Sequence, residues 1–357
     1  MKAKLIISFL LIIFMLNLTF AEKQIQGIID KDTRWSAEDG PFVITGDILV
    51  TELASLVISP GTVIIIEEPK RNSDSLPQFD KSDSSLISLK IQGAFSCVGR
   101  KDKPIKFIPR NPGFSKFNWR GIVLDRAIDE YTEIAFTEIS GASTALTVQS
   151  CSPLIRNTLF ENNNLAVSCI SGGAARISNC IMVRNFTAAV KIELSNPKIS
   201  NSILAFNNNL GLWCDMRSKI DFEFNCIFGN KDGNFLDCNP EFGILSRVNK
   251  NKDSTDRYGN LIMDPVFAGS PSENRAIELD VNLPTDKSKV KDPTLTEIVN
   301  SKRPGVPLQP LKNTNDRYTL SKYSPCLNAG NPSKKFCNSD GSLNTMGISG
   351  GPDFIGE

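Results

Sequence analysis

Three stretches of the chain share one pattern: Pro153-Leu-Ile-Arg-Asn157-Thr-Leu159-Phe, Ala175-Arg-Ile-Ser-Asn179-Cys-Ile181-Met and Pro197-Lys-Ile-Ser-Asn201-Ser-Ile203-Leu. Equivalent residues are 22 positions apart, and a second asparagine follows in each copy, at Asn163, Asn185 and Asn207. A looser fourth copy, Asn225-Cys-Ile227-Phe-Gly-Asn230, comes 24 residues after the third. Self-similarity at a fixed period in this range is typical of a solenoid, in which each repeat packs against its neighbours.

Apolar and polar residues alternate in each copy, as in Ile177, Asn179 and Ile181, and turn residues close it. Alternation indicates a β-strand, whereas a leucine-rich or ankyrin repeat would place apolar residues three and four apart. Strands that recur in parallel every 22 residues predict an all-β fold. That fold is a single-stranded parallel β-helix with an irregular C-terminal region.

The asparagines of the repeat have two interpretations. They share the parity of the neighbouring isoleucines, so they point inward or lie at a corner. Inward asparagines, one per coil, would hydrogen-bond amide to amide along the stack. We predict such a ladder for Asn157, Asn179, Asn201 and Asn225. The alternative is ordinary turn asparagines in the left-handed conformation.

The first 21 residues have the pattern of a signal peptide. Lys2 and Lys4 precede an apolar run, and Ala21 ends a small-residue cleavage site, so Glu22 is the expected mature N-terminus. An uncleaved membrane anchor is the alternative, although the apolar run is short for one. The expected mature chain of 336 residues (357 minus 21) is secreted, to the extracellular space, the cell surface or the periplasm, with no membrane segment.

Charge and residue types exclude several classes of function. The formal net charge is +1 and no basic cluster is present, so a nucleic acid is not an expected partner. The chain has no histidine, which excludes Ser-His-Asp, Cys-His and histidine-zinc chemistry. Nine cysteines in an exported chain favour some disulfides, and Cys326 and Cys337, which flank a loop, are the expected pair.

Short β-branched strands broken by Gly and Pro-Gly turns occur earlier in the chain. They are Pro41-Phe-Val-Ile-Thr-Gly46-Asp47-Ile, Ile58-Ser-Pro60-Gly61-Thr-Val, Lys103-Pro104-Ile-Lys-Phe107 and Trp119-Arg-Gly121-Ile. These stretches resemble successive coils of the right-handed parallel β-helix proteins of the pectin-lyase-like superfamily. Three later stretches resemble its secreted bacterial members: Asn260-Leu-Ile-Met-Asp264-Pro265-Val-Phe267, Ser324-Pro325-Cys326-Leu-Asn-Ala-Gly330 and Asp340-Gly341 through Gly350-Gly351. The resemblance covers residues 35–351 and implies the right-handed coil.

This resemblance divides the mature chain into two parts. We expect the parallel β-helix over residues 22–260 and a C-terminal extension over 261–357 that completes or caps the solenoid. Residues 268–316 replace a link that is short in the group, and their Lys, Asp and Pro content predicts a polar surface insert.

The resemblance does not assign a reaction, because the group is functionally mixed. Polygalacturonase motifs include a histidine, and pectate lyase and pectin methylesterase motifs are missing, so no family catalytic residue is carried over. We expect no cofactor and keep calcium as the one metal candidate. Asn338-Ser-Asp340-Gly341-Ser resembles half of a calcium loop, but one acidic residue fits an Asx turn better, and Thr345 replaces the acidic residue usual in the group.

One pair of carboxylates remains as a candidate catalytic site. Glu193 and Asp215 are 22 residues apart, so they would lie on adjacent coils, whose strands stack about 4.8 Å apart. Carboxyl groups about 5 Å apart suit a retaining glycosidase, because crowding raises one pKa and leaves an acid beside a base. Trp213 would share the face of Asp215 and stack on a sugar ring. The structural alternative is surface carboxylates neutralised by Lys191 or Arg217, with Trp213 in the core.

We therefore expect an exported, non-enzymatic, monomeric β-helix that binds an extracellular or cell-surface polysaccharide. One alternative is a polysaccharide hydrolase or lyase with the carboxylate site, and another is a structural or adhesive envelope protein. Binding predicts exposed aromatic side chains along one face of the solenoid. The residues whose exposure tests this prediction are Trp119, Trp213, Phe206 and Phe228.

Overall fold

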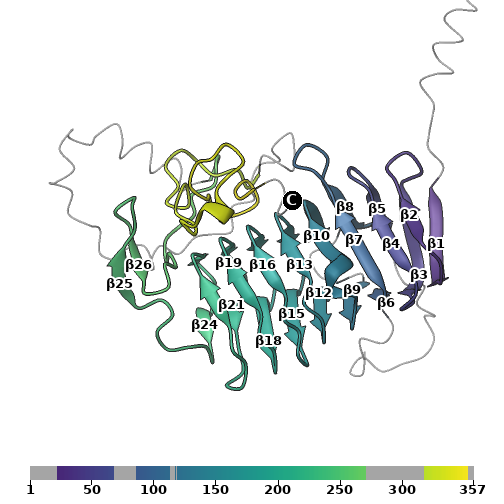
Figure 1. Cartoon of the computed structure of the whole chain (residues 1–357), viewed down its shortest axis with the longest axis horizontal. Helices are drawn as coiled ribbons and strands as arrows, with labels where there is room; N and C mark the ends of the chain where they lie inside the picture. The colour runs from purple at the N-terminus through teal and green to yellow at the C-terminus, as the bar shows by residue number, and fades with distance from the viewer. Residues whose placement is uncertain (1–21, 68–85, 113–116, 118, 271–316, 353–357) are drawn as a thin grey trace, which may run out of the picture.

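The computed structural model describes residues 22–67, 86–112, 117, 119–270 and 317–352. Within this part of the chain, short strands wind into an all-β parallel solenoid of about eight turns (Figure 1). The expected signal peptide, and the predicted insert from residue 271 to 316, lie outside the described residues. The only helices in the described part are two 3-10 turns, η2 (Asp129–Tyr131) and η5 (Lys334–Phe336), and neither could span a membrane.

Three faces of parallel strands make up the solenoid. The first face contains β2 (Thr33–Trp35), β4 (Ser55–Ile58), β7 (Ala94–Val98), β10 (Thr132–Ala135), β13 (Leu154–Arg156), β16 (Arg176–Ser178), β19 (Lys198–Ser200) and β22 (Asp221–Glu223). The second face contains the first half of β3 (Phe42–Val50), β5 (Val63–Ile66), β8 (Ile105–Pro109), β11 (Thr137–Ser140), β14 (Leu159–Glu161), β17 (Ile181–Val183), β20 (Ile203–Ala205) and β23 (Cys226–Phe228). The third face contains β1 (Lys23–Ile29), the second half of β3, β6 (Ile87–Ile91), β9 (Trp119–Asp125), β12 (Thr144–Gln149), β15 (Leu165–Ile170), β18 (Ala188–Glu193), β21 (Leu210–Trp213) and β24 (Gly233–Leu236).

The pairing of strands follows the sequence repeat. Ile155 pairs with Ile177, and Ile177 pairs with Ile199, in the first face. In the second face Leu159, Ile181 and Ile203 pair in the same way. The predicted parallel β-helix is therefore confirmed, with coils of about 23 residues.

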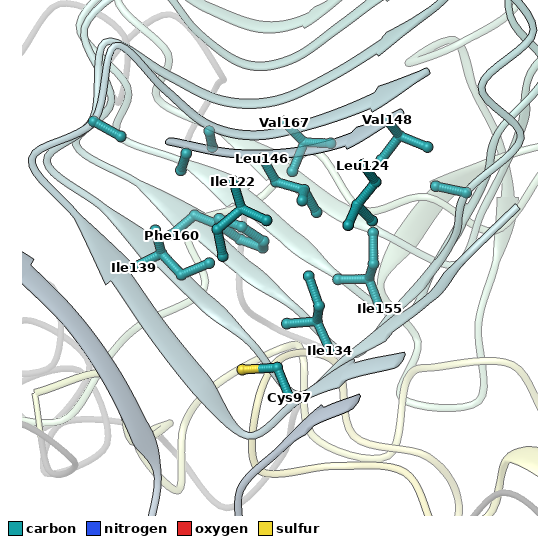
Figure 2. Packing of buried hydrophobic residues seen from close by; sticks show 14 of the residues in the cluster. Cys97, Ile122, Leu124, Ile134, Ile139, Leu146, Val148, Ile155, Phe160 and Val167 are labelled. Carbon is teal, nitrogen blue, oxygen red and sulfur yellow. The ribbon is translucent and has the colours of Figure 1, made fainter. Parts of the chain in front are cut away.

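Inward side chains of the three faces stack into one continuous apolar core (Figure 2). Ile134, Ile155 and Phe160 are fully buried, and the rings of Phe107 and Trp119 stack with centroids 5.9 Å apart. Complete burial of one such aliphatic or aromatic side chain contributes about 1.5–3 kcal/mol to folding. Because each coil buries its own set against the next, the fold is stabilised along its whole length.

The first corner, between the first and second faces, turns on one left-handed residue in each of five successive coils. These residues are Phe136, Asn157, Asn179, Asn201 and Phe224, with φ between 46° and 54°. Asparagine tolerates this conformation better than most residues. The left-handed residue reverses the side-chain alternation, so Ile155 points into the core while Leu159 points out of it.

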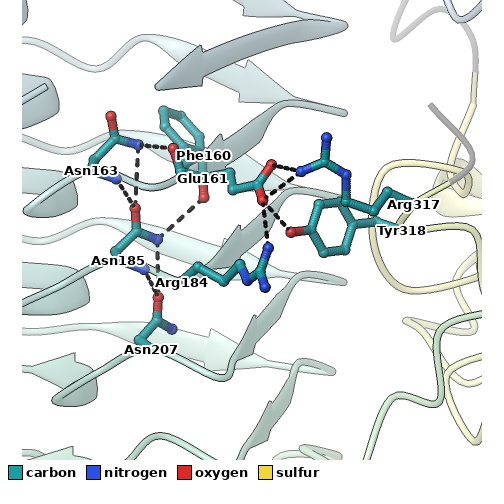
Figure 3. A network of polar contacts seen from close by, with 8 residues as sticks. All are labelled: Phe160, Glu161, Asn163, Arg184, Asn185, Asn207, Arg317 and Tyr318. Atoms are coloured by element: carbon teal, nitrogen blue, oxygen red, sulfur yellow. Dashed lines mark hydrogen bonds and ion pairs between the residues drawn. The ribbon is translucent and has the colours of Figure 1, made fainter. Parts of the chain in front are cut away.

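The predicted ladder is wrong for Asn157, Asn179 and Asn201, which bond to the C-terminal segment and not to one another. The ladder runs instead through the second asparagine of each repeat (Figure 3). Oδ1 of Asn185 accepts hydrogen bonds from the backbone N–H and Nδ2 of Asn163, at 3.1 and 3.2 Å. Asn207 receives the same two bonds from Asn185, and Asn230 receives them from Asn207. The bonds offset the cost of burying these amides.

Asn225 belongs to a third, shorter column, and not to the one that its sequence spacing suggested. Its Oδ1 accepts from the backbone N–H of Ser202 at 3.0 Å, and its own N–H donates to Oδ1 of Asn260 at 2.9 Å. The prediction for Asn225 is thus correct in kind, since it does form an amide ladder, but wrong in its partners.

The C-terminal segment, residues 317–352, lies along the outer side of the second face, where Figure 1 shows it in yellow. Outward side chains such as Leu159, Ile181 and Ile203 pack against its apolar residues Tyr318 and Met346. Three first-corner asparagines hold it in place. Nδ2 of Asn157 donates to O of Gly350 at 2.8 Å, Nδ2 of Asn179 donates to O of Thr345 at 2.8 Å, and Oδ1 of Asn201 accepts from the N–H of Asn331 at 2.7 Å.

The predicted disulfide between Cys326 and Cys337 is not formed in this structure. Both residues are free thiols. Cys326 is fully buried, and its side chain hydrogen-bonds to Cys226 of β23. The partner of Cys326 is therefore a cysteine of the solenoid and not the one across its own loop.

Each end of the solenoid is covered by chain. At the N-terminal end β1 pairs with β3, and Ile25 and Ile29 pack on the core. At the other end Phe242 packs against Phe222 and Tyr258, with ring centroids 5.5 and 5.1 Å away. The antiparallel hairpin of β25 (Leu245–Val248) and β26 (Ser254–Asp256) follows, and Leu261 then pairs in parallel with Cys226. That bridge extends the second face by one more step.

Candidate functional site

The predicted carboxylate pair is engaged in local structure. Glu193 makes an ion pair with Lys191 at 3.0 Å. Asp215 accepts hydrogen bonds from the backbone N–H groups of Leu194 at 2.8 Å and Ser218 at 2.7 Å. The Ser218 hydroxyl and these amides lower the pKa of Asp215, whereas an acid catalyst needs a raised pKa. The geometry therefore gives Asp215 the role of a turn cap.

Trp213 offers less stacking surface than the sequence suggested. It is half-buried, and Nζ of Lys191 lies 4.5 Å from its ring centroid. Trp119 is fully buried, with its indole N–H bonded to O of Ser140 at 3.1 Å. Phe206 and Phe228 are half-buried and pack edge to face at 5.9 Å. The face of the Trp213 ring is thus already occupied by a cation from the preceding coil, since Lys191 of β18 pairs with Trp213 of β21.

A groove of about 610 Å³ opens at the second corner, between the second and third faces. The residues just before Asn163, Asn185 and Asn207 have positive φ there, as does Gly141 at the equivalent position one coil earlier: Gly141 (72°), Asn162 (57°), Arg184 (57°) and Phe206 (56°). All four line the groove, as do Phe186 and Asn208, which come shortly after their ladder asparagines. Since successive coils stack about 4.8 Å apart, the groove runs along the solenoid axis across four coils.

The backbone of the groove is set by the ladder beneath it. Arginine and phenylalanine seldom adopt positive φ, and such residues persist where the surrounding structure over-determines them. Asn185 and Asn207 fix the backbone that follows Arg184 and Phe206 through buried hydrogen bonds. The groove is therefore presented on a rigid element and not on a free loop.

Aromatic rings line part of the groove. Phe117 and Phe186 pack edge to face with centroids 6.4 Å apart, and Phe186 keeps 57% of its surface exposed. Phe206 adds a third ring. Pro109 and Pro112 extend this apolar side, whereas Asn162, Asn208 and Ser140 supply amide and hydroxyl groups. The lining thus joins flat apolar surfaces to neutral hydrogen-bonding groups.

One charged side chain, Arg184, is found among the described residues that line the groove. Nη1 of Arg184 lies 3.5 Å from Oε1 of Glu161, a carboxylate that is 9% exposed (Figure 3). Nη1 of Arg317 lies 3.0 Å from the same oxygen, and the Tyr318 hydroxyl donates to it at 2.6 Å. Burial and the Glu161 charge raise the pKa of Tyr318, so its hydroxyl remains a donor.

This network ties the groove to the C-terminal segment. Two guanidinium groups and one hydroxyl surround a single buried carboxylate, which satisfies its charge and leaves an excess of positive charge beside the groove. Arg184 is about one-third exposed, so part of its guanidinium is free to meet an oxygen-rich ligand. Glu161 itself is held between the two arginines and is not a lining residue.

A second hollow, of about 440 Å³, lies between the β25–β26 hairpin and the C-terminal segment. Arg257 in its wall is paired with Glu241 at 2.7 Å, and the hydroxyl of Tyr258 donates to the same carboxylate at 2.9 Å. These polar groups already satisfy one another. The hollow also lacks the exposed ring that marks the second-corner groove.

The described residues contain no group of three acidic or thiol side chains placed to hold a metal ion. In the candidate calcium loop Asp340 accepts hydrogen bonds from the backbone N–H and hydroxyl of Ser342, at 2.9 and 2.6 Å. These bonds are those of an Asx turn.

Neither Arg184 nor Phe186 stood out in the sequence, although both flank Asn185, the second asparagine of its repeat. The sequence signal that could have identified them is their position beside a ladder asparagine. A residue beside an inward ladder asparagine must leave the core, so its side chain is presented at the corner. Comparing these flanking positions across the repeats would have marked the groove.

The coils that carry the groove match a known protein family. Residues 111–249 match the family model described as right handed beta helix region. No curated protein and no solved structure matched the chain. The matched range begins ahead of β9 and ends after β25, and the parallel solenoid agrees with it. The chain is therefore a right-handed parallel β-helix protein, consistent with the pectin-lyase-like superfamily.

Proposed function

We propose that the protein is an exported β-helix that binds an extracellular or cell-surface polysaccharide in the second-corner groove without cleaving it. The observation that carries the proposal is the lining of the groove. Exposed Phe186 and its neighbour Phe117 offer ring faces and edges to the apolar side of a sugar, while Asn162, Asn208 and Arg184 offer partners to its hydroxyl groups.

The shape of the groove favours a polymer over a single sugar. It follows the solenoid axis over four coils, so it presents a row of similar positions. A chain of linked sugars can use several positions at once, and each added contact raises the affinity.

Binding is the proposed role, and catalysis is not, because of how the nearby carboxylates are used. Glu161 is fixed between Arg184 and Arg317, and Asp215 caps a turn with its pKa lowered. A glycosidase needs two carboxyl groups that face a shared substrate, one of them with a raised pKa.

The test is a glycan-array screen of residues 22–357, followed by product analysis for each polymer that binds. Phe186→Ala should weaken binding of a positive polymer about tenfold, which corresponds to about 1.4 kcal/mol. Trp213→Ala is the matched control, since it removes an aromatic side chain from the third face, and it should leave the affinity unchanged.

Three results would contradict the proposal. Cleavage of a bound polymer would make the protein an enzyme. Loss of binding in Trp213→Ala but not in Phe186→Ala would move the site to the third face. Absence of binding to every polymer would favour a structural or adhesive role in the envelope.

A further inference from the structure

Two cysteines lie side by side where the last two coils end on the third face. Cys214 follows β21 directly, and Cys238 comes two residues after β24. The two strands pair in parallel, and the N–H of Cys214 donates to O of Leu236 at 3.0 Å. Adjacent coils at this spacing bring equivalent β-carbons close to the separation found in disulfides.

The two sulfur atoms are 2.9 Å apart, which is closer than non-bonded sulfur atoms ordinarily approach. Cys214 is 5% exposed, whereas Cys238 is only half-buried, so one of the pair can be reached from solvent. A disulfide bond is about 2.0 Å long, so the two sulfur atoms need to approach by only about 1 Å to form one.

Three other cysteines of the solenoid have a different setting. Cys97, Cys169 and Cys180 are fully buried, and burial raises the pKa of each thiol to about 12. These thiols behave as small apolar side chains. By contrast, the contact with the Cys214 sulfur lowers the pKa of Cys238, which favours the Cys238 thiolate.

We propose that Cys214 and Cys238 form a disulfide that staples the last coil of the solenoid to the one before it. The oxidant is a protein or small-molecule disulfide. The Cys238 thiolate attacks one sulfur of that disulfide and releases a thiolate, which leaves a mixed disulfide on Cys238. Cys214 then loses its proton and attacks the Cys238 sulfur, and the second thiolate departs.

The reaction is balanced. One sulfur–sulfur bond of the oxidant breaks, and one forms between Cys214 and Cys238. Two electrons pass to the oxidant, whose two thiolates take up the two protons of the cysteines. The net change in the protein is the loss of two hydrogen atoms.

The position of the bond explains what it would do. The ring that it closes contains β22, β23 and β24, the strands of the last coil. This coil is the last with strands on all three faces, and the aromatic cluster of Phe222, Phe235 and Phe242 covers the core at this end. A terminal repeat frays most readily, so a staple has the greatest effect there.

The experiment uses the full chain, exported into an oxidising compartment and purified without reductant. Free thiols are alkylated under denaturing conditions, and the protein is digested with trypsin. Cleavage after Lys and Arg places Cys214 in residues 199–217, Cys238 in 232–247, Cys226 in 220–231, Cys326 in 323–334 and Cys337 in 336–357. Each of these five cysteines is therefore detected in a separate peptide by mass spectrometry.

We expect a species that joins residues 199–217 to 232–247 and disappears on reduction. Reduction of the folded protein should lower its thermal midpoint, and the Cys214→Ser, Cys238→Ser double variant should have the same lowered midpoint with or without reductant. Cys337→Ser is the control and should retain the cross-linked species. Recovery of Cys214 and Cys238 only as alkylated peptides, or joined to other cysteines, would overturn the proposal.

Discussion

The two corners that flank the second face look alike in the sequence and differ in what they do. Both turn on a left-handed residue in successive coils. At the first corner three of these residues are asparagines, and their side chains hold the C-terminal segment. At the second corner they are Gly141, Asn162, Arg184 and Phe206, and they open into a groove. The same left-handed backbone conformation therefore attaches the C-terminal segment at the first corner and places side chains along the groove at the second.

The difference depends on what covers each corner. The C-terminal segment lies over the first corner, so the asparagine side chains of that corner are buried against the segment's backbone carbonyl and N–H groups. The second corner has its asparagines one residue later, pointing inward, and its left-handed residues are exposed or half-buried along the groove. The inward asparagine column stabilises the coils, whereas the left-handed residues of the groove can differ from coil to coil and contact a ligand.

Breaking the inward column should have the largest effect. In Asn185→Ala the backbone N–H of Asn163 and the carbonyl of Phe160 each lose a side-chain partner in a fully buried site, while Nδ2 of Asn163 keeps its bonds to backbone carbonyls. Each orphaned group costs about 1–3 kcal/mol, so the free energy of unfolding should fall by about 2–5 kcal/mol. Chemical denaturation measures it. The exposed groove residue in Asn208→Ala is the control and should change stability by less than about 0.5 kcal/mol.

A smaller effect is expected at the first corner. Asn179→Gly keeps the left-handed backbone but removes the bonds to Thr345 and Asn344, which should cost about 2 kcal/mol. The loss should fall on the C-terminal segment, and faster proteolysis within residues 317–352 would show it. Asn179→Ala should cost about 1 kcal/mol more, because alanine is strained at this φ. Equal stability of Asn179→Gly and the native chain would contradict the proposed attachment.

The equivalent change at the second corner should be nearly neutral for stability. Arg184→Gly loses a partly exposed ion pair with Glu161, worth about 0–1 kcal/mol, but relieves the left-handed conformation by a similar amount. The unfolding free energy should change by less than about 1 kcal/mol, while polymer binding weakens. A large loss of stability would show that Arg184 is structural, as Asn179 is.

The smallest effect is expected at Asp215. Its pKa is lowered, so the carboxylate form contributes stability above the unfolded pKa of about 3.9, and this contribution is lost as the pH falls through the lower folded value. Asp215→Asn should thus be slightly less stable than the native chain above about pH 4, and the difference should vanish as the pH falls further and the native carboxyl is protonated. The effect is small because the group is solvated. Thermal unfolding at several pH values tests this. Polymer cleavage by the native chain that is lost in Asp215→Asn would contradict the turn-cap role.

The fold could be predicted because it depends on local pattern repeated at a fixed interval. Ile155, Ile177 and Ile199 alternate with polar residues, and only stacked parallel strands bury all three. The members of the ladder could not be predicted by counting parity, because one left-handed residue such as Asn157 exchanges inside and outside. The pattern therefore predicts the ladder at the first asparagine of each repeat, whereas the structure forms it at the second.

The candidate site was less predictable, since it depends on contacts between distant residues. Nothing near Glu161 in the sequence indicates that Arg317 and Tyr318 will pack on it. Trp213 and Asp215 had the residue types of a sugar site, but Lys191 and the amide of Leu194 already occupy them. The 24-residue spacing of Cys214 and Cys238, close to one coil, was the one local clue to their contact.

The central claim is that the second-corner groove holds the polymer. A crystal structure of the protein with an oligosaccharide from a polymer that binds on the array tests it most directly. We predict sugar rings against Phe186 and Phe117, with hydroxyl groups near Arg184 and the amides of Asn162 and Asn208. An oligosaccharide seated on Trp213 and the third face, with the groove empty, would contradict the claim.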